Sequence, residues 1–555
     1  MYLGYNNNAN GTLNLIGGTN SFGFTANGTG GKLYIGSGGG STGTVNKIGG
    51  LLVTTNGTWT VGYNGYGNMT ASGGVWYAYA VNVAGNSGQG VLNLIDGTNQ
   101  LFSNLIIATG PTGSMSMTRG KLVVTNVTAN AALTVGRSGA SNFEVTNAQV
   151  IVNSLYIGDL SGSRGSMTVV GGQLTLNNLN LGNGASGTLS LYGATTTVTT
   201  AASLGCADGG VGTLNLVGGY LNMAGVSFTV GYAHVFNCAA TISNNATLIC
   251  NGLGLGNVSN GNEGSNRVTI AAGGQVLSSS SVVLSKGTNN QILVVSGGLL
   301  ETCNGFWIDT TWATGNVISN SGGIYQFAVA NNAPIVPGLG AIIINGGTIS
   351  YRNLTGIDIR WNKTDRLTNM VWMAGGTNAF RLNNSTNIAS GQDYTFAANL
   401  GPTNYARLEL VNGNTCYRGG DVTIGTGGSI LFSNTTALVT GSLTNNGGTI
   451  TVVDSTVTIK TNLTLAEGST INWASNTVST LITVTGKLTL PTNATLNLTS
   501  PIGRADQVTL FSSTNAIIGS PANWTMSLGS HRLALVGATN LVARPRSPGF
   551  VFQVE

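Results

Sequence analysis

The phrase Gly11-Thr12-Leu13-Asn14-Leu15-Ile16-Gly17-Gly18 recurs along this chain and decides its fold. Close copies lie at Gly165-Ser166-Met167-Thr168-Val169-Val170-Gly171-Gly172 and at Gly212-Thr213-Leu214-Asn215-Leu216-Val217-Gly218-Gly219, with weaker copies at 90–97 and 187–193. Within each copy apolar and polar residues alternate, so Leu13 and Leu15 point one way while Thr12 and Asn14 point the other. This two-residue period predicts a half-buried β-strand and excludes a helix there.

A second phrase, apolar-x-apolar-Gly, gives the length of the repeat. It occurs at Leu33-Tyr34-Ile35-Gly36, Leu133-Thr134-Val135-Gly136, Leu155-Tyr156-Ile157-Gly158, Leu179-Asn180-Leu181-Gly182, Phe228-Thr229-Val230-Gly231 and Leu253-Gly254-Leu255-Gly256. The 220 residues from Gly36 to Gly256 divide into nine intervals, which gives a period of roughly 24 residues. A period of this length is typical of a solenoid.

We therefore predict an all-β chain that forms a single-stranded parallel β-helix, or β-solenoid. Each coil of roughly 24 residues would contain two or three short strands, joined by Gly-rich corners where positive φ is needed. A lone strand cannot bury its apolar face, but coils stacked about 4.8 Å apart place equivalent leucines in one internal column.

Changes in repeat quality divide the chain into five expected parts. Residues 1–345 form the regular β-helix array, 346–420 form irregular charged coils or an insertion, and 421–500 continue the β-helix. Residues 501–542 form a terminal β cap, and 543–555 form a tail.

Composition narrows the classes of function. Only 7% of the 555 residues are charged, against about 25% in an average protein, which excludes helical bundles and coiled coils. The net charge of +5 is spread thinly, so nucleic acid is not an expected partner. No apolar run reaches the roughly 20 residues of a membrane span, and the first residues do not resemble a leader. Because the repeat is already present at Thr12, we expect a mature product or a fragment.

The five cysteines show neither metal-site spacing nor a disulfide framework. They are Cys206, Cys238, Cys250, Cys303 and Cys416, with no CxxC pair and no neighbouring histidine cluster. Buried thiols are the first expectation, and one bridge between Cys238 and Cys250 is the alternative.

We predict no catalytic residues, no metal and no cofactor. The 16 acidic residues are scattered singly, whereas hydrolysis of a glycosidic bond needs a facing pair of carboxylates. His234 and His531 are roughly a dozen coils apart and are expected in exposed loops. The alternative is a polysaccharide lyase or glycoside hydrolase that uses region 352–381. Its candidate residues would be Asp358 and Asp365 as calcium ligands, and Arg360, Lys363 or Arg366 as the base. Asp358 and Arg360 equally suit a surface ion pair.

Several aromatic residues are candidates for stacking on sugars, although packing in the core or in side-chain ladders is the favoured interpretation. They are Phe306, Trp307, Trp312, Trp361 and Trp372.

The GTLNLxGG phrase followed by LxIG resembles the passenger repeats of autotransporter-associated β-strand proteins of Gram-negative bacteria. The stretch from Val508-Thr509-Leu510-Phe511 to Leu541 is similar to the segment that ends such arrays. The resemblance implies an extracellular or cell-surface β-helical rod and transfers no catalytic residue. No C-terminal β-barrel follows the array, so a route of export and attachment is not carried over.

The expected function is structural: a secreted or surface-displayed β-solenoid that serves as an adhesin, stalk, matrix or filament component. Polar side-chain ladders would form its binding face, with surface glycans or matrix as candidate partners. Because nothing caps the first coil, we also expect self-association along the solenoid axis.

Overall fold

The computed structural model describes most of the chain. The described residues are 1–23, 32–232, 236–256, 264–285, 287–308, 315–327, 335–336, 341–344, 348–352, 370–372, 379–383, 394–396, 407–417, 421–474, 480–499, 507–527 and 530–546. Across these residues the structure consists of β-strands and turns without a helix. The chain divides into two compact units, with residues 1–301 in the first and 342–555 in the second.

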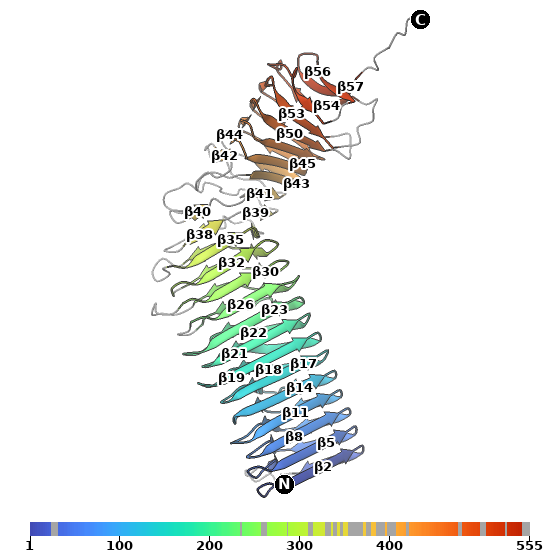
Figure 1. Cartoon of the computed structure of the whole chain (residues 1–555), viewed down its shortest axis with the longest axis vertical. Coiled ribbons are helices and arrows are strands. Elements are labelled where there is room, and N and C mark those ends of the chain that lie inside the picture. Colours follow the sequence, from blue (N-terminus) through green and yellow to red (C-terminus); the bar gives the residue numbers. More distant parts are fainter. Residues whose placement is uncertain are drawn as a thin grey trace, which may run out of the picture. The chain divides into compact units, whose positions relative to one another are not determined.

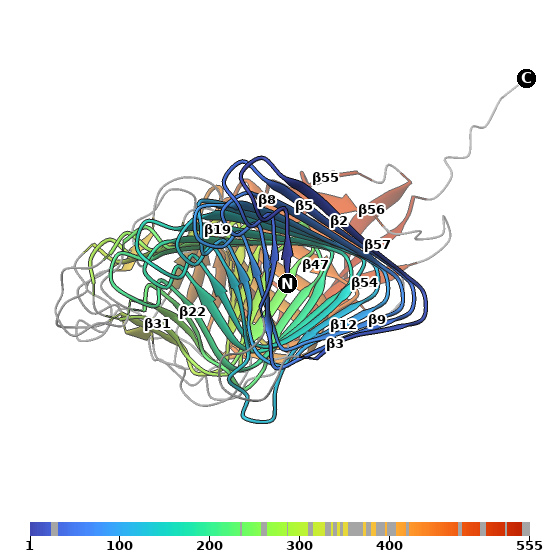
Figure 2. The same cartoon turned by 90° about the horizontal axis from the view of Figure 1, so that it is seen from below.

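Each coil of the first unit contributes one strand, or one part of a long strand, to each of three faces (Figures 1 and 2). The first face is built from β2 (Asn10–Ile16), β5 (Thr42–Ile48), β8 (Tyr66–Ser72), β11 (Gln89–Ile95), β14 (Thr112–Thr118), β17 (Ala140–Thr146), β19 (Arg164–Val170), β21 (Ser186–Tyr192), β23 (Val211–Val217), β26 (Ala239–Ser243), β29 (Arg267–Ile270) and β32 (Gln291–Val295). All neighbours on this face that have a described register pair in parallel, as predicted for a β-solenoid.

The other two faces are built in the same way. The second comprises β3 (Thr19–Gly23), β6 (Leu51–Thr55), β9 (Val75–Ala78), β12 (Thr98–Leu101), β15 (Lys121–Val124), β24 (Tyr220–Met223), β27 (Thr247–Cys250) and β30 (Gln275–Ser278). The third comprises β1 (Tyr2–Leu3), β4 (Lys32–Ile35), β7 (Thr58–Val61), β10 (Ala80–Val83), β13 (Leu105–Ile107), β16 (Ala132–Val135), β25 (Phe228–Val230), β28 (Leu253–Leu255), β31 (Val282–Leu284) and β34 (Phe306–Ile308). The long strands β18 (Gln149–Ile157), β20 (Gln173–Leu181) and β22 (Thr195–Leu204) turn the corner between these two faces.

The predicted period is confirmed by strand register. From β4 to β28 the third face advances through nine steps, the number inferred from the Gly36 to Gly256 spacing. On the first face, Gly43 pairs with Gly67, which lies 24 residues further along the chain.

The core of the first unit consists of columns of inward side chains. Leu189 pairs with Leu214 and both are fully buried, whereas Thr188 and Thr213, which precede them, face outward. Larger side chains also fit, because Trp59 and Trp76 pack with ring centroids 5.5 Å apart. Burial of such columns, at about 25 cal/mol per Å² of apolar surface, is the main stabilising contribution.

One column of residues, at a corner of successive coils, changes from mainly glycine to larger polar residues along the first unit. In the first-face strands its residues are Gly43, Gly67, Gly90, Gly113, Ser141, Gly165, Gly187 and Gly212, and Cys238, Asn266 and Asn290 continue it. Glycine is required at Gly187, where a Cβ would come within 2.0 Å of the Ile157 carbonyl oxygen. Further on, the backbone makes room for a buried ladder of asparagine side chains.

The asparagine ladder ties successive corners together. Asn266 Oδ1 accepts from the Cys238 backbone N–H at 3.0 Å, and Asn290 Oδ1 accepts from Asn266 Nδ2 at 2.9 Å. The Asn290 backbone N–H in turn donates to Asn316 Oδ1 at 2.8 Å. Each amide oxygen therefore satisfies a donor in the preceding coil, which a buried polar group requires.

The second unit also stacks parallel strands. One ladder contains β36 (Ile324–Phe327), β39 (Thr348–Arg352), β41 (Ala379–Asn383), β43 (Arg407–Tyr417), β45 (Ser429–Val439), β47 (Thr449–Val453), β50 (Ser469–Ala474), β53 (Ala494–Leu498) and β55 (Thr525–Met526). Another contains β42 (Tyr394–Phe396), β44 (Val422–Ile424), β46 (Leu443–Asn445), β49 (Leu463–Leu465) and β52 (Leu488–Thr489). Short strands in the range 299–372, which the two units divide between them, are β33 (Leu299–Thr302), β35 (Val317–Ser321), β37 (Ile335–Val336), β38 (Ala341–Ile344) and β40 (Met370–Trp372).

Pairing changes direction near the end of the second unit. β48 (Thr456–Ile459) and β51 (Leu481–Val484) pair in parallel, and β51 pairs in parallel with β54 (Val508–Ser513). β57 (Asn540–Pro545) then pairs antiparallel with both β54 and β56 (His531–Val536). Antiparallel strands in this position end the stack of parallel coils.

Two expectations about single residues need correction. His531, predicted in an exposed loop, begins β56 and is fully buried, with Nδ1 3.0 Å from the Ser530 hydroxyl. The alternative bridge between Cys238 and Cys250 is absent, and both residues are buried thiols, as is Cys416. Cys206 and Cys303 are partly exposed. His234 lies outside the described residues.

Candidate functional site

The outward side of the first face carries a column of uncharged polar side chains. Asn46 Nδ2 donates to Asn14 Oδ1 at 2.9 Å, and the Ser116 hydroxyl donates to Asn93 Oδ1 at 2.8 Å. Asn215 Nδ2 donates to the Ser190 hydroxyl at 3.2 Å. These contacts join side chains one coil apart, so the column is a partly self-satisfied polar ladder of the kind predicted from the sequence.

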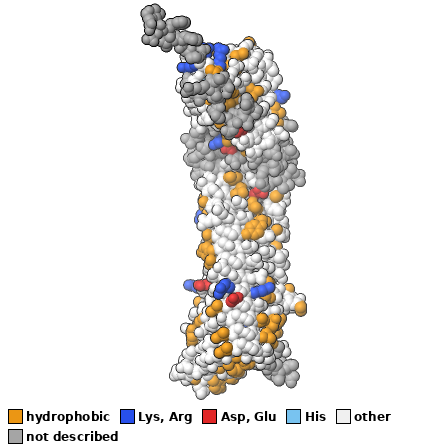
Figure 3. Space-filling view, turned by 90° about the vertical axis from the view of Figure 1, so that its right-hand side faces the viewer, with side chains coloured by type: hydrophobic (Ala, Val, Ile, Leu, Met, Phe, Trp, Pro, Cys, Tyr) orange, Lys and Arg blue, Asp and Glu red, His pale blue; other side chains and the backbone are white. Residues whose placement is uncertain are grey.

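Charged residues are few on this unit and gather over a short span. Between residues 96 and 164 they are Asp96, Arg119, Lys121, Arg137, Glu144, Asp159 and Arg164. In the lower part of Figure 3, acidic and basic side chains form a narrow mixed group, and other charged side chains on that face are scattered. Both signs are interspersed, so the group creates no strong field of one sign.

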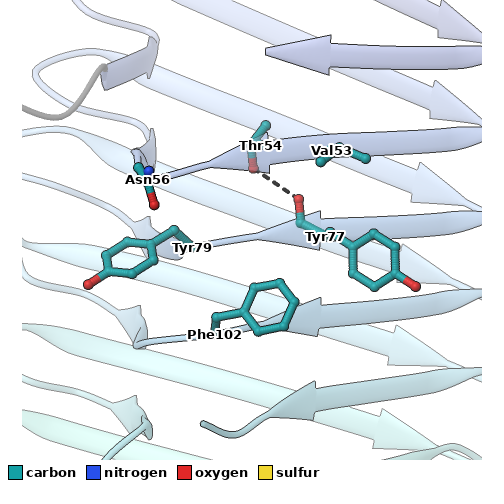
Figure 4. Close-up of a pocket in the computed structure, with 6 residues that line it drawn as sticks. All are labelled: Val53, Thr54, Asn56, Tyr77, Tyr79 and Phe102. Carbon is teal, nitrogen blue, oxygen red and sulfur yellow. Dashed lines mark hydrogen bonds between the residues drawn. The ribbon is translucent and has the colours of Figure 1, made fainter. Parts of the chain in front are cut away.

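An aromatic pocket of about 400 Å³ lies on the outer side of the second face (Figure 4). Tyr77, Tyr79 and Phe102 form it together with Val53, Thr54 and Asn56. Strand alternation explains the arrangement, since Trp76 and Ala78 point into the core and Tyr77 points out. The backbone register places Tyr77 beside Val53 in the preceding coil and beside Gln100 in the next.

The rings of this pocket form a broad apolar surface. The centroids of Tyr77 and Phe102 are 6.1 Å apart with an interplanar angle of 20°. Tyr79 is 45% exposed and Phe102 is 43% exposed. Figure 4 shows the three rings side by side across neighbouring coils, with the Asn56 amide above Tyr79. Exposed ring faces beside an amide suit stacking against a sugar ring.

A second aromatic cluster lies on the third face. Tyr34 lies between Tyr2, on which it stacks, and Tyr63, whose ring is tilted by 47°; the centroid distances are 5.3 Å and 4.3 Å. With Asn64 and Ser37 these rings line an open cleft of about 780 Å³. Neither aromatic surface was predicted from the sequence. The alternation in Trp76-Tyr77-Ala78-Tyr79 could have indicated that the two tyrosines share the outward side of a strand.

The predicted alternative catalytic cluster cannot be placed. Asp358, Arg360, Lys363, Asp365 and Arg366 all lie outside the described residues, as do Trp312 and Trp361. Phe306 begins β34 and Trp372 ends β40, while Trp307 in β34 is 40% exposed on the outer surface.

Several of the described carboxylates are engaged in local contacts. Within the described ranges no three His, Cys, Asp or Glu side chains converge on a point where a metal ion could bind. Asp159 accepts from Asn183 Nδ2 at 2.9 Å, and Asp96 accepts from the Gly97 N–H at 2.7 Å, so both serve local structure.

The fold is the property by which this chain can be classified. The architecture places the chain in the class of parallel β-solenoids. No family model matches the sequence, and no curated protein is significantly similar to it. In the part of the chain that the structure describes, no helix has the length and apolar character of a transmembrane segment.

Proposed function

We propose that this chain is a secreted or surface-displayed structural β-solenoid, of the kind found in autotransporter passengers. The observation that carries the proposal is the uncharged polar ladder on the first face, where hydrogen bonds such as Asn46 to Asn14 join consecutive coils. Side chains that hydrogen-bond one another stiffen a surface, and few of their polar groups remain free to take part in catalysis. A regular surface of low reactivity suits a stalk, adhesin or matrix component.

The aromatic pocket gives the proposed solenoid a binding face for neutral glycans. Its lining of Tyr77, Tyr79, Phe102 and Asn56 contains no charged side chain. Stacking of a sugar ring on an aromatic face removes apolar surface from water, while an amide hydrogen-bonds the hydroxyls. The activity proposed here is binding without bond cleavage.

Axial self-association belongs to the same proposal. Among the described strands, β2 pairs with β5 on one side only. An edge strand presents backbone N–H and C=O groups that a further strand can pair with. A second copy, or a preceding coil of the same protein, would satisfy them.

The surface location can be tested by labelling intact cells of the source organism with antibody raised against the purified chain. Labelling before permeabilisation is expected. Labelling that appears only after permeabilisation would overturn the proposed location.

The glycan site can be tested separately by retention on immobilised neutral polysaccharides. Tyr79→Ala and Phe102→Ala should each weaken retention about tenfold, which corresponds to loss of one stacking contact. Tyr192→Ala is the matched control, because Tyr192 is an equally exposed tyrosine on the first face. Equal retention of all three variants would exclude the pocket as the binding site.

A further inference from the structure

A second pocket, of about 390 Å³, lies among the last strands of the second unit. Its walls include Arg532 and Leu535 of β56, Arg546, and Trp524, Pro521 and Met526 from the preceding segment. The Trp524 indole N–H is satisfied by the Pro491 carbonyl oxygen at 2.9 Å, which fixes the ring in place. Two arginines therefore line a pocket that also has an apolar wall.

The basic residues at this pocket lie close enough to repel one another. Arg532 of β56 lies directly opposite Arg544 of β57 in the antiparallel register. Like charges at directly opposed positions on two strands destabilise the pair. Arg546 lies two residues beyond Arg544, so three arginines occupy one small region of the sheet end.

No carboxylate of the described chain neutralises this group. The ion pair present among the described residues of this unit joins Arg407 to Glu409 at 2.9 Å, in β43. The Nε of Arg544 is buried and has no hydrogen-bond acceptor among the described residues. A buried donor with no acceptor is destabilising, so the described part of this sheet end retains both a repulsive pair and an unsatisfied donor.

We propose that this pocket, which we name the arginine pocket, is a binding site for an anionic carbohydrate that carries carboxylate groups. A carboxylate accepts two parallel hydrogen bonds from a guanidinium group, which fits Arg532 and Arg546. Trp524, Pro521 and Met526 supply an apolar wall for the face of a sugar ring. Basic side chains are visible at this end of the second unit in Figure 3. The site is independent of the aromatic pocket in the first unit and of the proposed surface location.

The probe for this site is polygalacturonate, which carries one carboxylate per sugar. The full chain should be retarded in native gels that contain polygalacturonate, and its fully methyl-esterified form should have little effect. Retardation should decrease as salt is raised, because the contact is ionic. Equal retardation by the neutral ester would show that the carboxylates are not recognised, and would overturn the proposal.

Arg532→Gln and Arg546→Gln should each weaken binding about tenfold, the loss expected for one charge-assisted hydrogen-bonded contact. Arg267→Gln is the control, since it removes the same charge from an exposed position of the first unit. Arg532→Lys should give an intermediate affinity, because lysine keeps the charge and loses the planar fork. If Arg267→Gln weakens binding as much as the pocket variants, only net charge is involved and the proposed site is wrong.

Thermal unfolding gives a second readout. Arg532→Gln removes the repulsion between residue 532 and Arg544, so without ligand the Tm of this variant should equal or exceed that of the unaltered protein. Polygalacturonate should raise the Tm of the unaltered protein by more than it raises the Tm of the variant. Polyphosphate serves as an anion without a sugar. Stabilisation by polyphosphate equal to that by polygalacturonate would overturn the assignment to carbohydrate.

Discussion

Alternation of inward and outward side chains can be tested at adjacent residues of β23. Leu214 is fully buried between the corresponding residues of neighbouring coils, whereas Asn215 faces outward. Leu214→Asn should lower the free energy of unfolding by about 3–5 kcal/mol, because it leaves a cavity and buries an amide without partners. Asn215→Thr should cost less than about 1 kcal/mol. Urea denaturation of the two variants measures both values, and similar losses would contradict the assigned faces.

Buried thiols make stability sensitive to alkaline pH. Burial raises the pKa of Cys206 to about 12, that of Cys238 to about 11 and that of Cys250 to about 12. Above the unfolded pKa of about 9, unfolding releases protons that the folded state retains, so stability falls as pH rises. Each thiol should contribute a slope of up to about 1.4 kcal/mol per pH unit between pH 9 and 10.

The measurement is urea denaturation at a series of pH values for the unaltered protein and for Cys250→Ala. The variant should show a shallower decline, even though its stability at pH 7 is lower. Lys47→Met is an informative control. Burial lowers the pKa of Lys47, so this lysine favours folding as pH rises, and its removal should steepen the decline. An unchanged slope in Cys250→Ala would show that this thiol ionises equally in both states.

At the scale of the coil, the corner column sets which residues are tolerated. Gly187 has no room for a Cβ beside the Ile157 carbonyl, whereas a Cβ on Gly254 would meet nothing within 4 Å. Gly187→Ala should therefore destabilise the protein by several kcal/mol, and Gly254→Ala should be close to neutral. Thermal unfolding of the two variants tests this difference. A tolerated Gly187→Ala would mean that the corner opens without cost.

The elements themselves were largely predictable from the sequence. The phrases around Leu13 and Gly36 contain the strand period, the corner glycines and the coil length, because each coil repeats the same local requirements. His531 was mispredicted because its burial depends on β57, which follows it and pairs antiparallel. The aromatic pocket was missed because Tyr79 and Phe102 belong to different coils, and proximity across coils depends on register. Asn266 and Asn290 were not recognised as a ladder for the same reason.

At the scale of the whole molecule, axial association can be tested with two matched variants. Thr12 and Thr213 occupy the same outward column, Thr12 in the edge strand β2 and Thr213 eight coils further on. A charged residue on an edge strand discourages strand addition, so Thr12→Lys should reduce association while Thr213→Lys should not. Light scattering and negative-stain microscopy measure the assembled fraction. A monodisperse monomer at high concentration, before any substitution, would contradict axial association.

The stacking of one coil on another also defines how the first unit would respond to force. Its coil-to-coil backbone hydrogen bonds run along the stacking axis, and each coil adds only about 4.8 Å to the stack. Tension applied along that axis would open the bonds of an end coil before those of its neighbours are loaded. Each coil so released contains about 24 residues, as between Gly43 and Gly67, and would extend to roughly 80 Å. A solenoid of this construction would lengthen in discrete steps and absorb mechanical work while most of its coils stay folded.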